Sequence, residues 1–206
     1  MRIHSSSFEH GKPIPPEFAM GTPDGFGGNR NPQLSWEGVP DDTKSFALLC
    51  IDTDVPTDGA MVNKAGVEIP VAQPRTHFTH WAMVDIPRDV TDIAAGSCSD
   101  GISKGGKQAP KGPDGARQGL NDYTQWFDGD ADMGGDYFGY DGPYPPANDL
   151  RIHRYFFRVF ALDVGTLELP EKFTGADVLQ AIQGHVLAEA ATHGTYSLHP
   201  DPKTHP

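Results

Sequence analysis

The sequence predicts a β-rich fold with few helices, on the basis of its turn-forming residues and its apolar patterns. The 206 residues include 24 glycines and 19 prolines, which indicates many turns without reaching the level typical of disordered chains. One segment is apolar almost throughout and two others alternate with the period of a strand. A chain of this length is expected to form one domain over residues 1–206.

The N-terminal part and the first core strand are predicted as follows. Prolines and glycines punctuate the chain through Trp36, so we expect ordered coil with short strands there. Residues 45–51 read Ser-Phe-Ala-Leu-Leu-Cys-Ile and stop at Asp52, a pattern typical of a strand buried on both faces. Residues 58–74 mix Gly, Asn, Lys and Pro with short apolar pieces and are expected to leave the core as an excursion or hairpin.

Two further strands and a long loop complete the predicted core. Residues 78–86 alternate, which would place His80 on the face of Ala82 and opposite Trp81. Residues 94–148 are rich in Gly, Asp and Pro and are expected to form surface loop that contributes to binding. Residues 153–161 alternate again, with His153 and Tyr155 on one face.

A helix is predicted near the C-terminus. Thr174 begins a Thr-x-x-Asp capping pattern, and an apolar stripe follows at helical spacing, formed by Leu179, Ile182, Val186 and Ala190. We expect this helix to end near Gly194 and to be followed by a frayed polar tail that includes Pro206. The apolar strip around Val186 and Leu187 leaves room for a homodimer.

Charge and composition restrict the function. The formal net charge of -12 argues against nucleic acid and anionic lipid surfaces as partners, since both are bound through clustered Lys and Arg. The sequence shows no secretion signal and no apolar stretch long enough to enter a membrane, so a cytoplasmic protein without membrane insertion is expected. Cys50 and Cys98 do not form a disulfide framework.

Three short motifs carry most of the unusual residues. They are Asp52-Thr-Asp54-Val-Pro56, His80-Trp81, and Gly142-Pro143-Tyr144-Pro145-Pro146 leading to His153-Arg154-Tyr155. Together they resemble the phosphatidylethanolamine-binding protein family, and most closely its bacterial and archaeal branch, often described as Raf kinase inhibitor-like. Asn31-Pro-Gln-Leu-Ser-Trp36 and Gly119-Leu-Asn-Asp-Tyr123 support the same resemblance, which spans nearly the whole chain.

The resemblance implies a β-sandwich of antiparallel or mixed sheets with peripheral helices, including a C-terminal helix, and a shallow anion pocket. It implies a ligand-binding set of Asp52, Asp54, His80, Gly142, Pro143, Tyr144, Pro145, Pro146, His153 and Tyr155. It also implies a non-enzymatic binding or regulatory protein for a phosphate-like, phosphoethanolamine-type ligand, with a kinase or protease as a conceivable protein partner. Tyr144 departs from other branches, which carry a small residue there.

The residue types fit such a pocket. Histidine and tyrosine side chains can donate hydrogen bonds to an oxyanion, and Asp52 is expected to accept from a histidine and to favour its charged form. On this hypothesis phosphate-type ligands bind more tightly as the pH falls towards about 6, where a histidine of ordinary pKa becomes charged. Replacing His153 by alanine is then expected to weaken binding without unfolding the chain.

Other interpretations of these residues stay open. Asp52, His80 and His153 could instead form a hydrolytic site, by acid/base chemistry or with a metal, although no nucleophile motif is present. The residues Asp128, Asp130 and Asp132 are spaced like a calcium loop, but Met133 and Gly139 occupy positions that need glycine and a carboxylate, so a solvated acidic turn is favoured. No catalytic residue, cofactor or metal is expected.

Overall fold

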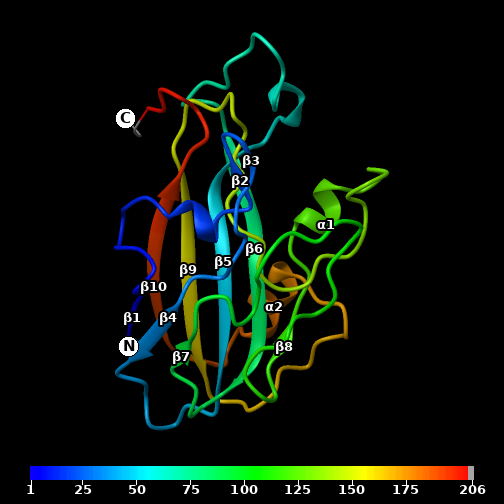
Figure 1. The fold of residues 1–206 in the computed structure, drawn as a ribbon. Coiled ribbons are helices and arrows are strands. Elements are labelled where there is room, and N and C mark those ends of the chain that lie inside the picture. The colour runs from blue at the N-terminus through cyan, green and yellow to red at the C-terminus, as the bar shows by residue number, and fades with distance from the viewer. Residues whose placement is uncertain (204–206) are drawn as a thin grey trace.

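A twisted five-stranded antiparallel sheet forms the centre of the computed structural model, which describes residues 1–203. Its strand order is β10-β9-β5-β6-β8 (Figure 1). The strands are β5 (Ser45–Pro56), β6 (Arg75–Pro87), β8 (Arg117–Gln118), β9 (His153–Leu162) and β10 (Val186–Tyr196). The three predicted core strands are thus confirmed, and the structure shows that they are neighbours with β5 in the middle.

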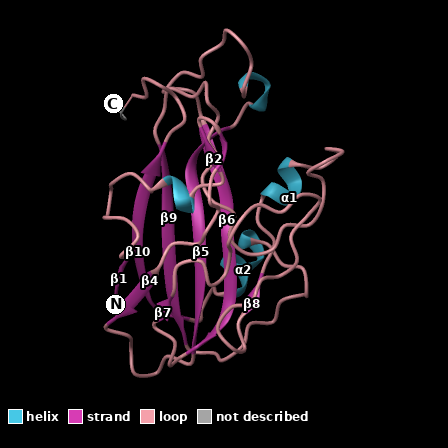
Figure 2. Ribbon diagram, in the orientation of Figure 1, coloured by secondary structure: helices cyan, strands magenta, loops and turns pink. Residues whose placement is uncertain are grey.

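Two smaller sheets and short helices surround the central sheet (Figure 2). The three-stranded sheet joins β1 (Arg2–His4), β4 (Leu34–Glu37) and β7 (Asp92–Ile93), and a hairpin joins β2 (Gly21–Thr22) and β3 (Gly25–Phe26). The helices are α1 (Tyr123–Trp126), α2 (Gly175–Ala181), and the 3-10 turns η1 (Pro16–Phe18) and η2 (Gly59–Met61). No helix among residues 1–203 has the length and apolar character needed to cross a membrane.

Each face of the central sheet has its own core. On one face Phe46, Leu48 and Trp81 pack towards Leu34 and Trp36 of the small sheet. On the other face a second apolar cluster packs beneath α2 and the segment before it, and contains Ala47, Leu49, Ala82, Val84, Phe173 and Val178. Sheet-on-sheet packing with peripheral helices confirms the predicted fold class.

The predicted C-terminal helix is correct at its start and wrong at its end. The Thr174 hydroxyl and the Asp177 carboxylate form the expected capping box. The helix ends at Ala181, and Gly184, with φ at +84°, turns the chain into β10. Val186 and Leu187 therefore lie exposed on a strand rather than on a helical stripe.

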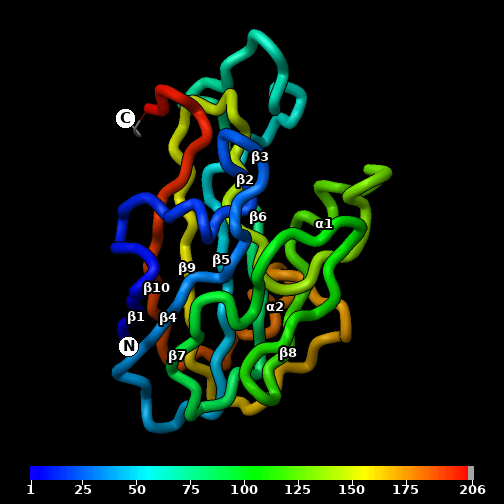
Figure 3. Tube along the Cα trace, viewed as in Figure 1, coloured from blue at the N-terminus to red at the C-terminus, as the bar shows by residue number. Residues whose placement is uncertain are grey.

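The N-terminal segment lies along β10, and the C-terminal segment continues beyond this strand to the residues before β9. Backbone hydrogen bonds join Gly11 to His193 and Ile14 to Thr195, so the N-terminal segment covers part of this edge strand (Figure 3). The tail is not frayed up to Lys203, whose N–H donates to the Leu150 carbonyl at 2.7 Å. The prediction for Pro206 lies outside the described residues.

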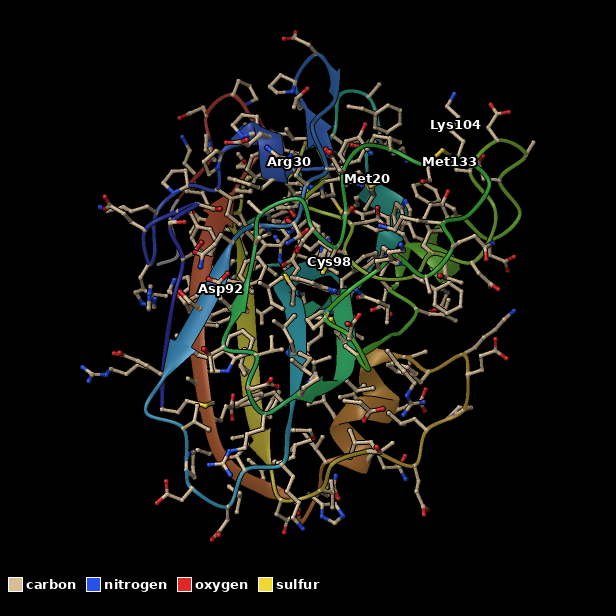
Figure 4. All side chains as sticks on the ribbon, turned by 60° about the horizontal axis from the view of Figure 1, so that its bottom comes forward. Met20, Arg30, Asp92, Cys98, Lys104 and Met133 are labelled. Atoms are coloured by element: carbon tan, nitrogen blue, oxygen red, sulfur yellow. The ribbon has the colours of Figure 1, made fainter. Side chains whose placement is uncertain are left out.

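Side chains fill the space between these layers. In Figure 4 Cys98 lies over the central strands and is buried, whereas Lys104 projects from the periphery and is exposed. Both Cys50 and Cys98 are free.

Candidate ligand pocket

A β-bulge in β6 aims His80 at the pocket. Cys50 pairs with Trp81 whereas the next residue, Ile51, pairs with Thr79, so the register shifts by one residue at His80. His80 therefore lies on the face of Trp81, and the predicted strict alternation with Ala82 is wrong at this position.

The His80 ring is held from behind by the loop that follows Tyr140. Its Nδ1 lies 2.8 Å from the Asp141 carbonyl oxygen, and the Asp141 N–H donates back to the His80 carbonyl at 3.0 Å. Burial lowers the pKa of His80 below its ordinary value, although the nearby negative charges of Asp52, Asp141 and Asp122 act in the opposite direction. Burial thus favours the neutral form of His80.

The Asp141 side chain is the centre of a buried polar hub. Its carboxylate accepts hydrogen bonds at 2.7 Å from the amides of both Asn29 and Asn121, and pairs with the Lys107 ammonium at 2.9 Å. Four segments that lie far apart in the sequence thus meet behind His80. This hub fixes the loop that carries the Gly/Pro motif.

His153 lies at the inner end of the pocket between two buried carboxylates. Its Nδ1 is 2.6 Å from Asp52 and its Nε2 is 3.0 Å from Asp149, which Arg75 engages through both terminal nitrogens of its guanidinium. Burial alone would lower the pKa of His153, but Asp52 and Asp149 outweigh it and raise that pKa to about 9. The imidazolium is consequently charged, and both of its N–H groups are used within the protein.

Tyr155 contributes to the pocket a buried hydroxyl that makes no hydrogen bond of normal geometry among residues 1–203. The side chain is fully buried, and its ring packs edge-on against His80 at a centroid distance of 5.1 Å. Burial, the negative charge of Asp52 and the proximity of the hydroxyl to the Asp52 carboxylate raise the pKa of Tyr155 well above its usual value. Within the described residues the hydroxyl makes no hydrogen bond of normal geometry, so it can donate to a ligand.

These groups line a pocket of about 240 Å³. Its lining residues with polar groups are Asp52, Asn63, His80, Tyr123, Tyr144, His153 and Tyr155. Its walls are apolar and aromatic, formed by Val55, Pro56, Gly59, Val62, Phe78, Trp126, Phe127, Pro145 and Pro146. The pocket opens between α1 and the 57–74 excursion, which is the loop nearest the top of Figure 1.

Seven of the ten predicted ligand-binding residues line this pocket: Asp52, His80, Tyr144, Pro145, Pro146, His153 and Tyr155. Asp54, Gly142 and Pro143 do not. Asp54 lies within β5 and binds Arg151 and Arg154, because the register shift between Asp52 and Val55 carries its side chain away from the pocket. The His153 prediction also needs correction, since both nitrogens are occupied and the ring contributes charge rather than a free donor.

Gly142 and Pro143 support the pocket from behind. The Gly142 carbonyl accepts from the Tyr123 hydroxyl at 3.0 Å, and a Cβ at this position would approach the Phe18 carbonyl oxygen to 2.2 Å. The Pro143 carbonyl accepts from the N–H groups of Met20 and Gly21. Within the Gly/Pro motif, Gly142 and Pro143 therefore support the pocket, whereas Tyr144, Pro145 and Pro146 line it.

Sequence reasoning missed part of the apolar wall of the pocket. Phe78, Trp126, Phe127 and Val62 stand in none of the motifs quoted above. Tyr123 had a signal, because it ends the Gly-Leu-Asn-Asp-Tyr stretch that supports the family resemblance.

The acidic turn after α1 is a self-capped loop. The Asp130 carboxylate accepts from the backbone N–H groups of Asp132 and Met133, and hydrogen bonds from these two groups lower its pKa. Among residues 1–203, no group of three or more His, Cys, Asp or Glu side chains is arranged to hold a metal ion.

The fold and this pocket together define a β-sandwich binding protein. The model of the phosphatidylethanolamine-binding protein family matches residues 4–197, and the chain belongs to that family. It is 36% identical over 170 residues to a UPF0098 protein of Methanothermobacter thermautotrophicus, covering 82% of this chain and 84% of that protein. It is 32% identical over 198 residues to a UPF0098 protein of Aquifex aeolicus, covering 95% and 88%.

Solved structures give the same assignment. The crystal structure of Escherichia coli YbcL, described as a new member of the mammalian PEBP family, matches with a TM-score of 0.72 and 28% identity over 95% of this chain and 97% of that chain. CT736 of Chlamydia trachomatis, described as a putative PEBP homolog, matches with a TM-score of 0.64 and 28% identity over 95% and 96%. Family membership supports a binding or regulatory protein and gives the hydrolase alternative no support.

Proposed function

We propose that this chain is a non-enzymatic binding protein whose pocket takes a small phosphate-like anion of the phosphoethanolamine type. The observation that carries this proposal is the Tyr155 hydroxyl. Buried polar groups normally have a partner, and leaving one without a partner costs about 1–3 kcal/mol. A donor left free at the inner end of a pocket is therefore expected to bind an acceptor on the ligand.

Charge compensation behind the pocket supports an anionic ligand. Asp52 alone would repel an anion, but its carboxylate is paired with the charged His153 at 2.6 Å and also accepts from the Asp54 N–H at 2.8 Å. Arg75 balances Asp149 in the same way. The inner end thus holds two carboxylates and two cations, which removes the barrier that an uncompensated Asp52 would impose.

The apolar walls suit the remainder of such a ligand. Phe78, Trp126 and Phe127 offer aromatic faces above which an ammonium or an apolar substituent can lie. Tyr144 adds to the rim and is 40% exposed. Since the pocket exceeds the volume of a few water molecules, at roughly 30 Å³ each, it has room for more than a bare tetrahedral oxyanion.

Titration calorimetry with phosphoethanolamine and methyl phosphate on the wild type and the Tyr155→Phe variant tests the proposal. We expect Tyr155→Phe to weaken binding about tenfold or more, because one donor to the ligand is lost. Its unfolding free energy should change little, because the hydroxyl makes no hydrogen bond of normal geometry in the described part of the protein.

Tyr137→Phe is the matched control. Its hydroxyl is also buried but donates to the Met133 carbonyl at 2.6 Å and lies outside the pocket lining. This variant should lose about 1 kcal/mol of stability and keep its affinity. Wild-type protein that binds neither compound, or Tyr155→Phe with undiminished affinity, would refute the proposal.

The proposal extends to regulation of a protein partner, a kinase or a protease. Family membership supports this part only at the level of a binding or regulatory protein. Ligand-dependent capture of a purified kinase or protease by the wild type, and its loss in Tyr155→Phe, is the corresponding test.

A further inference from the structure

The hydrogen-bonding character of His80 follows from its position. A carbonyl oxygen only accepts hydrogen bonds, so the Nδ1 that faces the Asp141 carbonyl must carry the ring proton. In the neutral imidazole the other nitrogen, Nε2, then presents a lone pair. No residue among 1–203 hydrogen-bonds this Nε2, and the ring lies in the pocket lining between Phe78, Tyr123 and Tyr155.

The inner end of the pocket therefore offers more acceptors than donors. His80 Nε2 and the Asp52 carboxylate accept, whereas the Tyr155 hydroxyl is a donor that lies near Asp52 without a hydrogen bond of normal geometry to any described residue. His153 adds no donor, because Asp52 and Asp149 occupy both of its N–H groups. The other charged groups around His80, Asp122 and Asp141, are also acidic. A fully deprotonated oxyanion would face lone pairs on two sides.

We propose that the pocket selects oxyanions that bring a proton of their own, such as the hydrogen-phosphate form of a phosphomonoester, over oxyanions without one, such as a sulfate ester. The ligand P–OH donates to His80 Nε2, and the Tyr155 hydroxyl donates to a second phosphate oxygen. This inference rests on the proposed function and names the protonation state of its ligand.

Methyl phosphate and methyl sulfate form the matched pair of ligands for the test. Near pH 5 both are monoanions of almost the same shape, and they differ in that only the phosphate carries an O–H, which is lost with a pKa near 6. We expect methyl phosphate to bind the wild type roughly tenfold to a hundredfold more tightly, because methyl sulfate leaves a buried acceptor without a partner.

The pH profile separates ligand protonation from histidine protonation. Above about pH 6 the affinity for methyl phosphate should fall about tenfold per pH unit as the P–OH ionises, while the affinity for methyl sulfate stays flat. If a charged His80 were the recognition group, methyl sulfate would also bind more tightly as the pH falls. That result would overturn the inference.

A variant of His80 tests the assigned acceptor. Glutamine can donate as well as accept, so His80→Gln should bring the affinity ratio of the two ligands towards one. His77→Gln, an exposed change three residues earlier on β6, should leave the ratio unchanged. Thermal melts establish that each variant is folded. The affinity ratio and the pH profile of the wild type test the inference independently of both variants.

The outcomes separate the two proposals. If neither ligand binds at any pH, the anion-binding function fails and the inference fails with it. If both ligands bind the wild type equally, the binding function stands and the selectivity for a proton-bearing oxyanion is refuted.

Discussion

At the scale of single residues, His153 has a structural role at the inner end of the pocket. The side chain is buried between Asp52 and Asp149, and its charge keeps both carboxylates compensated. Removing one member of a buried ion pair leaves an uncompensated charge, which typically costs about 3–5 kcal/mol. The sequence-based expectation that His153→Ala leaves the fold intact must therefore be revised.

The stability of the protein should fall as the pH rises from about 6.5 to about 9. The pKa of His153 is raised to about 9 in the folded state. Between these pH values the folded state binds a proton that the unfolded state has released, so raising the pH favours unfolding. The contribution is complete below the unfolded pKa and is lost as the pH passes through the folded value.

Urea unfolding of the wild type and His153→Gln at about pH 6, 7.5 and 9 measures this effect. We expect the wild type to lose on the order of 3 kcal/mol across this range and His153→Gln to be less stable at the lowest pH with a flatter profile. His185→Gln is the control, because His185 pairs with Asp163 at the surface. A wild-type profile as flat as that of the variant would contradict the assigned charge.

At the scale of elements, the Asn148 side chain makes three of the hydrogen bonds that hold the 57–74 excursion in place. The Asn148 side chain donates to the carbonyls of Met61 and Val67 and accepts from the Asn63 N–H at 2.9 Å. Residues 57–68 contain no buried side chain, so polar contacts rather than apolar packing hold them. Val62 and Asn63 of this loop line the pocket.

Replacing Asn148 by alanine should release this wall of the pocket. We expect faster amide hydrogen exchange across residues 57–68 and a severalfold weaker affinity for methyl phosphate, with the unfolding free energy of the sheet little changed. Asp58→Ala is the control, because Asp58 caps only the local turn at Ala60. Unchanged exchange in Asn148→Ala would show that the amide does not hold the loop.

An element was predicted correctly where neighbouring residues in the sequence alone determine its pattern of apolar side chains. The patterns around Leu48, Val84 and Val159 identified the core strands because burial on a sheet imposes the apolar pattern directly. Val186 and Ala190 misled because their helical spacing does not reflect a shared face. A register shift in β10 between Val186 and Ala188 sets Val186 opposite Leu162 and Ala190 opposite Val159, which belong to the cores on different faces of the sheet.

The sequence predicted those pocket residues whose side chains have a distinctive chemistry. It did not predict those that reach the pocket only through tertiary packing. Asp52, His80 and Tyr155 stood in recognisable motifs, whereas Phe78 and Trp126 reach the pocket only through long-range loop packing. The bulge that reverses the side of His80 depends on its pairing with β5, which a single strand does not encode.

At the scale of the whole molecule, the net charge of -12 opposes the entry of any anion. Exposed charges interact over about 30 Å at 0.01 M salt but only about 8 Å at 0.15 M. Raising ionic strength should therefore strengthen methyl phosphate binding about twofold to threefold, the reverse of what basic anion-binding proteins show. Calorimetry with a salt of a bulky organic anion, which does not compete for the pocket, measures this change. Weaker binding at higher salt would indicate a locally positive field.

The Asp141 hub ties the order of folding to the chemistry of the pocket. Asn29, Lys107 and Asn121 reach Asp141 across long stretches of sequence, and contacts of this kind form late because closing large loops costs entropy before it is repaid. Until these contacts form, the Asp141 carbonyl is not held in position next to His80 Nδ1, and the ring proton of His80 is not confined to that nitrogen. A partly folded chain would present either nitrogen as the acceptor, so the capacity to distinguish a protonated from an unprotonated anion is acquired only when folding is complete.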